Sequence, residues 1–108
     1  MDVAIEFSVE ADAILRFLKS RALNCKSERM LLTAIMRKLT LIKTNPFYGQ
    51  PLSKRLIPKK YHVQNLYRVE LPQFWRMVYT LKDGNIEIIA FVLDILDHKK
   101  YDKEFKYK

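Results

Sequence analysis

The chain has 108 residues with a formal net charge of +8, as expected for one small basic domain. Its 2 glycines and single cysteine exclude a collagen-like chain and an internal disulfide. The longest apolar run, near residues 88–93, is too short to cross a bilayer, and the N-terminus does not resemble a signal peptide. We therefore expect a cytoplasmic protein without a membrane partner.

Residues 1–44 predict one strand followed by two helices. Apolar residues alternate with others over residues 3–7, which is the pattern of a strand. Ser8 and Ser27 are each suited to cap a helix, and apolar residues recur at helical spacing after both. The sequence Thr44-Asn45-Pro46 ends the second helix, because proline disfavours helical backbone at the residue before it. The two helices are expected to form a hairpin.

The remainder of the chain predicts a loop, three strands and a tail. Residues 46–60 hold three prolines and a glycine, and strand patterns follow at residues 63–71, 74–82 and 86–95. Asp83-Gly84 is a strong signal for a tight hairpin turn, and Asp97 can cap a short C-terminal helix. The fold class is therefore α+β: a single domain, residues 1–108, with the order β-α-α-β-β-β. The helical hairpin is expected on one face of a mainly antiparallel four-stranded sheet.

A period of two assigns the strand residues to opposite faces of this sheet. Trp75, Met77 and Tyr79 are expected to pack on the helices, whereas Arg76 lies on the opposite face, which no predicted helix covers. Arg68 and Glu70 share the face of Arg76. This pattern has two interpretations: an ion-pair cluster that only keeps the sheet soluble, or a guanidinium that grips a phosphate through paired N–H donors.

The positive charge is concentrated in residues 54–82 and in the tail. Such a distribution favours nucleic acid, an acidic protein or an anionic surface as partner, although simple solubility also accounts for it. Two scattered histidines give no metal motif, and no cofactor is expected. Tyr61 and His62 could stack on RNA bases or could lie in a solvated loop. The candidate RNA-binding residues are Lys54, Arg55, Lys59, Lys60 and Lys103.

Two segments carry a family resemblance. They are NPFYGQPLSKRL, residues 45–56, and LYRVELPQFWRMVYTLKDGNIEIIAFVLDILDHKKY, residues 66–101. Together with the order of elements, they make the chain similar to RelE/ParE-type toxins of type II toxin–antitoxin pairs. That family typically has an arginine, apolar residues and a tyrosine on one strand, here Arg76-Met77-Val78-Tyr79. A basic cluster with a tyrosine often follows the last strand, here His98-Lys99-Lys100-Tyr101.

The resemblance to the RelE-like branch implies a ribosome-dependent mRNA endonuclease. Cleavage would proceed without a metal, by attack of the RNA 2′-OH on the adjacent phosphate. The implied partners are mRNA on the ribosome and an acidic protein antitoxin that wraps the toxin, in a hetero-oligomer or with a toxin homodimer. The implied catalytic residues are Arg76 and Arg68 at the phosphate, Lys99 or Lys100 as a further cation, Tyr101 or Tyr107, and His98 as acid or base.

Glu70 departs from the family pattern, because some RNA-cleaving members have a lysine at its position. A carboxylate there places negative charge beside the expected phosphate site. Two alternatives therefore stay open: a ParE-like inhibitor of DNA gyrase, and a protein of the same fold that binds RNA or an antitoxin without cleaving.

Overall fold

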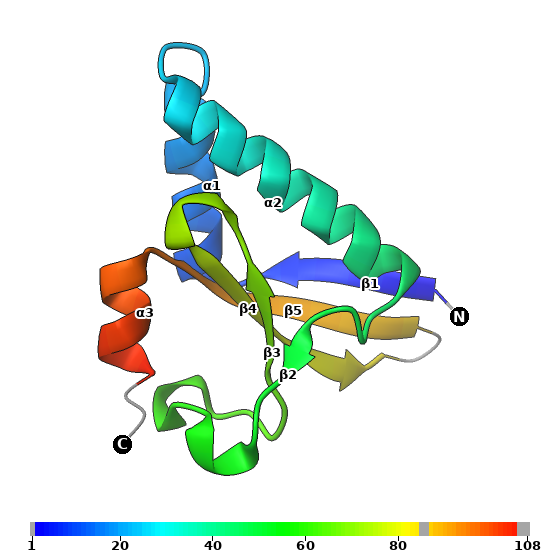
Figure 1. Ribbon diagram of the computed structural model, residues 1–108. Helices are drawn as coiled ribbons and strands as arrows, with labels where there is room; N and C mark the ends of the chain where they lie inside the picture. Colours follow the sequence, from blue (N-terminus) through cyan, green and yellow to red (C-terminus); the bar gives the residue numbers. More distant parts are fainter. Residues whose placement is uncertain (1, 85–86, 106–108) are drawn as a thin grey trace.

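The computed structural model of the protein describes residues 2–84 and 87–105 (Figure 1). Its sheet contains β1 (Asp2–Phe7), β2 (Gln50–Pro51), β3 (Tyr67–Glu70), β4 (Arg76–Asp83) and β5 (Glu87–Leu96), and its α-helices are α1 (Val9–Arg21), α2 (Lys26–Thr44) and α3 (His98–Glu104). The strand order is β1-β5-β4-β3-β2. Strand β1 runs parallel to β5 and the other neighbours are antiparallel. The predicted α+β class and the order of its main elements are confirmed.

The helical hairpin forms as predicted, with one change at the start of α2. The Ser8 side chain accepts a hydrogen bond of 3.0 Å from Ala11 N–H, so the predicted cap of α1 is confirmed. Helix α2 begins at Lys26, with Cys25 in the cap position, so the predicted cap at Ser27 is wrong. The Ser27 hydroxyl instead donates to the Gln73 side chain at 2.9 Å. Helix α2 ends at Thr44, where the proline signal placed its end.

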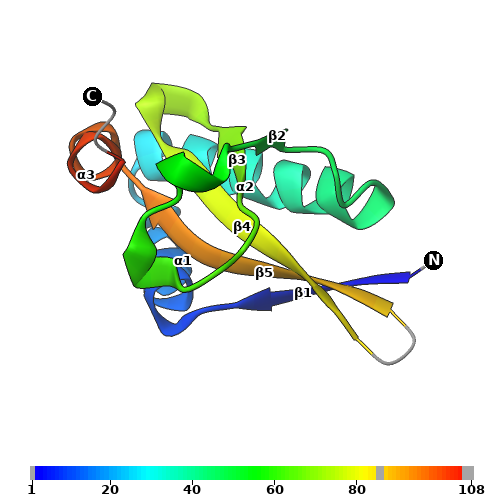
Figure 2. The same cartoon turned by 90° about the horizontal axis from the view of Figure 1, so that it is seen from below.

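The α1–α2 hairpin covers one face of the sheet (Figures 1 and 2). Met77 and Tyr79 of β4 are fully buried there, with Trp75 and Tyr67 packed against the same cluster. The period-two assignment of this face is therefore confirmed. The helices contribute Ala11, Leu15, Leu18, Leu31, Ile35, Leu39 and Ile42 to this core.

Within the described part of the chain, the sheet has five strands rather than the four predicted. Gln50 and Pro51, which were expected in a loop, pair with Arg68 and Tyr67 at the edge of the sheet. Proline is tolerated in this position because an edge strand need not donate every backbone N–H. Strand β3 is also shorter than predicted, since the Asn65 side chain bonds the backbone N–H and C=O of Leu81 in place of a strand partner.

The second sheet face is not open, so the prediction that no helix covers it is wrong. Alternation along the strands puts apolar side chains on this face, and they need cover from water. Helix α3 and the irregular segment of residues 52–63 supply it, on the side of the sheet opposite α2 (Figure 2). This second core contains Leu66, Val78, Leu93, Leu96, Tyr101 and Phe105.

The β4–β5 hairpin differs from its prediction at the turn. Asp83 is the last residue of β4, and Gly84 N–H donates to Glu87 O at 2.8 Å. The predicted start of the last strand at Ile86 lies outside the described residues. As predicted, β5 is central, between β1 and β4. The pairing of β4 with β5 shifts register between Val78 and Tyr79, so one β5 residue, Leu93, has no opposite partner.

Candidate functional site: two guanidiniums around a tyrosine

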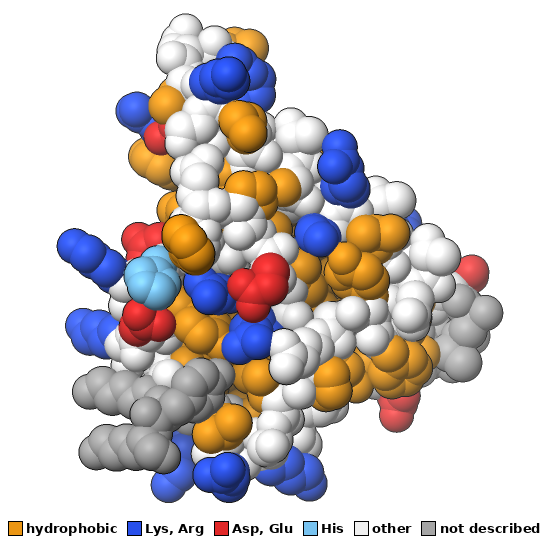
Figure 3. Space-filling model, viewed as in Figure 1, with side chains coloured by type: hydrophobic (Ala, Val, Ile, Leu, Met, Phe, Trp, Pro, Cys, Tyr) orange, Lys and Arg blue, Asp and Glu red, His pale blue; other side chains and the backbone are white. Residues whose placement is uncertain are grey.

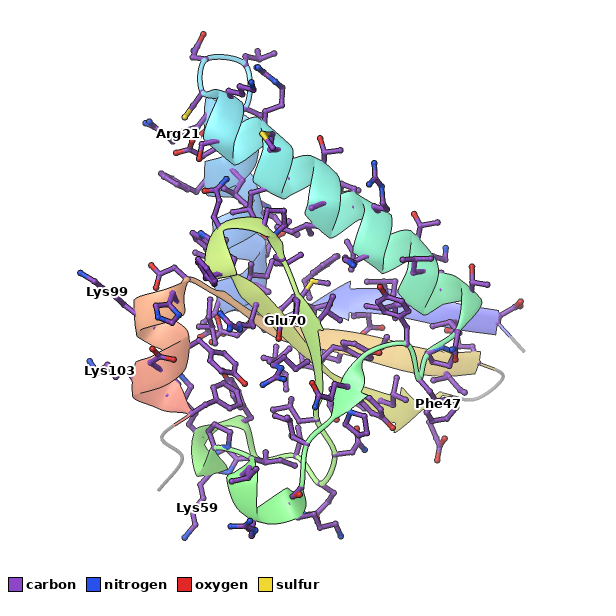
Figure 4. The ribbon with its side chains drawn as sticks, viewed as in Figure 1. Arg21, Phe47, Lys59, Glu70, Lys99 and Lys103 are labelled. Carbon is purple, nitrogen blue, oxygen red and sulfur yellow. The ribbon has the colours of Figure 1, made fainter. Side chains whose placement is uncertain are left out.

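Arg68 and Arg76 meet across the β3–β4 ladder. Glu70 is the direct partner of Arg76, and Arg68 lies two residues before Glu70. The Glu70 carboxylate is 3.1 Å from Nε of Arg68 and 3.1 Å from Nε of Arg76. Both contacts are ion pairs without the direction of a hydrogen bond. Two guanidiniums and one carboxylate leave this cluster with a net positive charge. It lies near the centre of the face seen in Figures 3 and 4.

Tyr101 of α3 contacts both guanidiniums. Its hydroxyl is 3.1 Å from Nη1 of Arg68, and its ring centre is 5.0 Å from Cζ of Arg76 and 5.9 Å from Cζ of Arg68. The ring also stacks on Phe105 at 4.4 Å. Only 3% of Tyr101 is exposed, so it serves as a platform that fixes the two charges through cation–π contact.

A backbone carbonyl and a side-chain oxygen also accept hydrogen bonds from the terminal nitrogens of the two guanidiniums. Arg76 Nη1 donates to the carbonyl of Phe74 at 2.5 Å, and Arg68 Nη2 donates to the Gln50 side chain at 2.5 Å. The side chains of Arg76 and Arg68 are 18% and 20% exposed, whereas that of Glu70 is 59% exposed. The arginines are therefore held in place, while their carboxylate partner faces solvent. Gln50 was not foreseen from the sequence, because its segment read as a loop.

The other predicted tail residues lie around this cluster rather than in it. His98 Nε2 is 3.2 Å from the Asp102 carboxylate one turn along α3, and its ring lies 5.8 Å from that of Phe74. Lys99, Lys100 and Lys103 are exposed, and Figure 4 shows Lys99 and Lys103 pointing from α3 away from Glu70. Tyr107 lies outside the described residues.

The predicted RNA-binding loop divides into two parts. Lys54 and Lys59 line a hollow of about 520 Å³ whose other walls include Ile57, His62 and Val63. Arg55 is exposed on the same loop.

Lys60, in contrast, also forms ion pairs within the chain, although its side chain stays 46% exposed. Its Nζ lies 3.0 Å from Glu104 and 4.0 Å from Asp94. Tyr61 is also engaged, since its hydroxyl donates to Asp94 at 3.1 Å and its ring packs on Phe105. Tyr61 is therefore half-buried and held by contacts within the chain, and its stacking on RNA bases stays a prediction.

Asp94 is a buried carboxyl that the sequence did not single out. It lies near the end of β5 and is 7% exposed. Burial raises its pKa, while the Tyr61 hydroxyl and the Lys60 ammonium partly offset the rise. Asp94 is the cross-strand partner of Val78, which belongs to the second core. The register shift between β4 and β5 places Asp94 on this face, so no regular spacing in the sequence could have identified it.

Tyr79, the tyrosine of the family-like strand sequence, is structural. Its hydroxyl donates to Pro46 O at 2.8 Å and accepts from Gly49 N–H at 2.9 Å. Burial raises its pKa to about 12. The side chain thus fastens the loop after α2 to the sheet, which agrees with its predicted place on the core face.

The described residues offer neither a cluster of metal-binding side chains nor a membrane-spanning helix. Over residues 2–84 and 87–105, no group of three or more His, Cys, Asp or Glu side chains is placed to hold a metal ion. In the same part of the chain, every helix is too short or too polar to span a membrane.

Comparison with known proteins identifies the architecture. No family model and no curated protein sequence matches the chain. Among solved structures, the chain is similar to the YoeB/ParE toxin from Agrobacterium tumefaciens, with a TM-score of 0.63 and 13% sequence identity. The match covers 88% of this chain and 98% of the toxin chain. The protein therefore has the fold of the RelE/ParE-type toxins.

Proposed function

We propose that this protein is the toxin of a toxin–antitoxin pair and an mRNA endonuclease that acts on the ribosome in the cytoplasm. The observation that carries the proposal is the pair of guanidiniums held by Tyr101. Preorganised donors of this kind stabilise charge that develops on a phosphate in the transition state. The fold, which it shares with a solved toxin, supports the same assignment.

The proposed reaction is a transesterification within the RNA. The 2′-oxygen loses its proton to a base and attacks the adjacent phosphorus, the P–O5′ bond breaks, and the 5′-oxygen takes a proton from an acid. The products are a 2′,3′-cyclic phosphate and a 5′-hydroxyl. Arg76 and Arg68 bind the phosphoryl oxygens, Tyr101 positions them, and His98 is the candidate acid or base at the rim. Lys99 or Lys100, exposed on α3 around the cluster, serves as a further cation.

The proposed partners follow from the charge of the surface. Lys54, Arg55, Lys59, Lys60 and Lys103 attract the RNA backbone or ribosomal RNA, and an acidic antitoxin neutralises the same surface. The antitoxin complex should weaken as salt rises, because exposed charges are screened over about 8 Å at physiological ionic strength. A complex whose affinity does not change with salt would indicate that the antitoxin binds outside this basic surface.

One observation favours a second candidate. Glu70 occupies the space between the two guanidiniums and competes with a phosphate for them. The same fold could therefore inhibit gyrase, or bind RNA or an antitoxin, without cleaving.

Expression of the chain in a translating extract, with the mRNA ends mapped, tests the first proposal. Cuts that appear only during translation and disappear in Arg76→Ala support it. Intact mRNA together with a block of gyrase supercoiling would favour the second.

A further inference from the structure

Phe74 is an aromatic side chain that the proposed chemistry leaves unused. It is 70% exposed, on the turn that precedes β4. Its carbonyl accepts the 2.5 Å hydrogen bond from Arg76, and its ring lies 5.8 Å from the His98 ring. The residue whose backbone carbonyl binds the guanidinium assigned to the phosphate therefore carries an exposed ring, which lies beside His98.

The backbone that presents Phe74 is held in an unfavourable conformation. Gln73 and Phe74 have φ angles of 60° and 63°, in the left-handed region that residues with a Cβ disfavour. The Gln73 side chain fastens the turn to α2, donating to Ser27 O at 3.2 Å and accepting from the Ser27 hydroxyl at 2.9 Å. Strain that the surroundings maintain in this way is concentrated at functional sites.

The turn gives the adjacent residues Phe74 and Trp75 different surroundings. Trp75, the next residue, packs against the first core. The turn thus partly buries one aromatic ring against the first core and leaves the other exposed to water. Exposure alone does not distinguish Phe74, because Phe47 is also exposed. What distinguishes Phe74 is its position, with its carbonyl bound to Arg76 and its ring beside His98, where a ligand held by Arg76 could place an apolar face on the ring.

We propose that Phe74 is a stacking platform for one unpaired base of a single-stranded RNA, adjacent to the phosphate held by Arg76 and Arg68. This inference rests on the proposed function, and it assigns the subsite that would position the nucleotide at the cut. Single-stranded nucleic acids are bound by such combinations of cationic groups with exposed aromatic rings. The cationic surroundings of Phe74 favour a nucleotide over an apolar anchor from a protein partner, which would be better accommodated among apolar side chains.

Binding of a short fluorescently labelled single-stranded RNA, followed by anisotropy, provides the test. The variants are Phe74→Ala, Phe74→Leu and Phe74→Tyr, each compared on an intact oligonucleotide and on one whose bases have been removed. Phe47→Ala is the matched control, because Phe47 is also an exposed phenylalanine, at 62%, and Figure 4 shows it far from Glu70.

The expected result is specific to the ring and to the base. Phe74→Ala should weaken binding of the intact RNA by about five- to a hundredfold, the range for loss of one base stack. Phe74→Leu should resemble it, and Phe74→Tyr should bind like the natural protein. The salt dependence of the RNA affinity should be unchanged in all three Phe74 variants, whereas Arg76→Ala should make this dependence shallower. The Phe74 substitutions should not change the affinity for the base-free RNA, and Phe47→Ala should not change the affinity for the intact RNA.

Equal losses on intact and base-free RNA would overturn the platform, as would natural binding by Phe74→Ala in a folded protein. Circular dichroism of the Leu and Tyr variants establishes folding independently. If the natural protein binds RNA but cuts no mRNA in a translating extract, the nuclease proposal fails while the binding comparison still decides the platform. If the natural protein binds no RNA, the platform is wrong.

Discussion

The Arg76 guanidinium lies 5.0 Å from the centre of the Tyr101 ring, which is itself stacked on Phe105. A residue in a β-strand is thereby fixed by a residue in the C-terminal helix. The contact explains how a small sheet tolerates a permanent charge among apolar neighbours: an aromatic face and a solvent-facing carboxylate compensate for lost hydration.

Replacement of Arg76 by alanine should affect both stability and cleavage. Because only 18% of this side chain is exposed, loss of its contacts with Tyr101 and Glu70 should cost about 1–3 kcal/mol in the free energy of unfolding. Any mRNA cleavage should fall by about two to three orders of magnitude. Thermal melting and end mapping on the same variant measure the two effects.

Arg76→Lys is the matched control for the geometry of the fork. It keeps the charge without the paired donors, so it should recover stability better than activity. Full toxicity and normal cleavage in Arg76→Ala would contradict the phosphate role.

Glu70→Gln should strengthen the binding of phosphate-containing ligands. The change removes a negative charge while preserving size, and one unit charge at about 4 Å is worth about 1 kcal/mol in a water-like medium. The affinity for a short RNA should rise by roughly fivefold, and stability should change by less than about 1 kcal/mol. Titration by anisotropy measures the first and denaturant unfolding the second. Unchanged or weaker RNA binding would show that Glu70 does not compete with the ligand.

Tyr101→Phe and Tyr101→Ala should separate the hydroxyl from the ring. The phenylalanine variant loses only the 3.1 Å bond to Arg68, so its stability should fall by about 1 kcal/mol. The alanine variant also loses the packing with Phe105, which should cost about 3–5 kcal/mol. If Tyr101 only positions the arginines, cleavage by the phenylalanine variant should stay within about tenfold of normal. A loss as large as that of Arg76→Ala would instead indicate a direct role of the hydroxyl in the reaction.

The buried Asp94 should make stability depend on pH. Its folded pKa is raised above its ordinary value of 3.8, so the folded state binds more protons between the two values. The extra proton binding stabilises the folded state, and this stabilisation is fully present below the unfolded pKa of Asp94 and is lost as pH rises through its folded pKa. Asp94→Asn should reduce the dependence and retain an acceptor for Tyr61. Urea unfolding across this range measures it, and identical pH profiles for both proteins would contradict the shift.

The tyrosine that fastens the loop after α2 offers a test of a purely structural role. Tyr79→Phe leaves Gly49 N–H and Pro46 O without their common partner, so stability should fall by about 1–3 kcal/mol. RNA binding at a temperature well below unfolding should be unchanged. Selective loss of RNA binding with normal stability would assign Tyr79 to the site.

The sequence by itself determined the elements and one face of the sheet. Helical spacing, the Ser8 cap and Pro46 located the hairpin, and a period of two separated Met77 and Tyr79 from Arg76. These signals are local, because each depends on residues a few positions apart. The same alternation already brought Arg68, Glu70 and Arg76 together as one cluster.

Only the tertiary structure decided what surrounds that cluster. The strand at Gln50–Pro51 lacked a strand pattern, and the cover over the second face came from α3 and the loop at residues 52–63. Tyr101 reaches Arg68 across 33 positions of sequence, and the register shift in β5 buries Asp94. Such contacts depend on how distant elements pack, and no periodicity within a single segment encodes them.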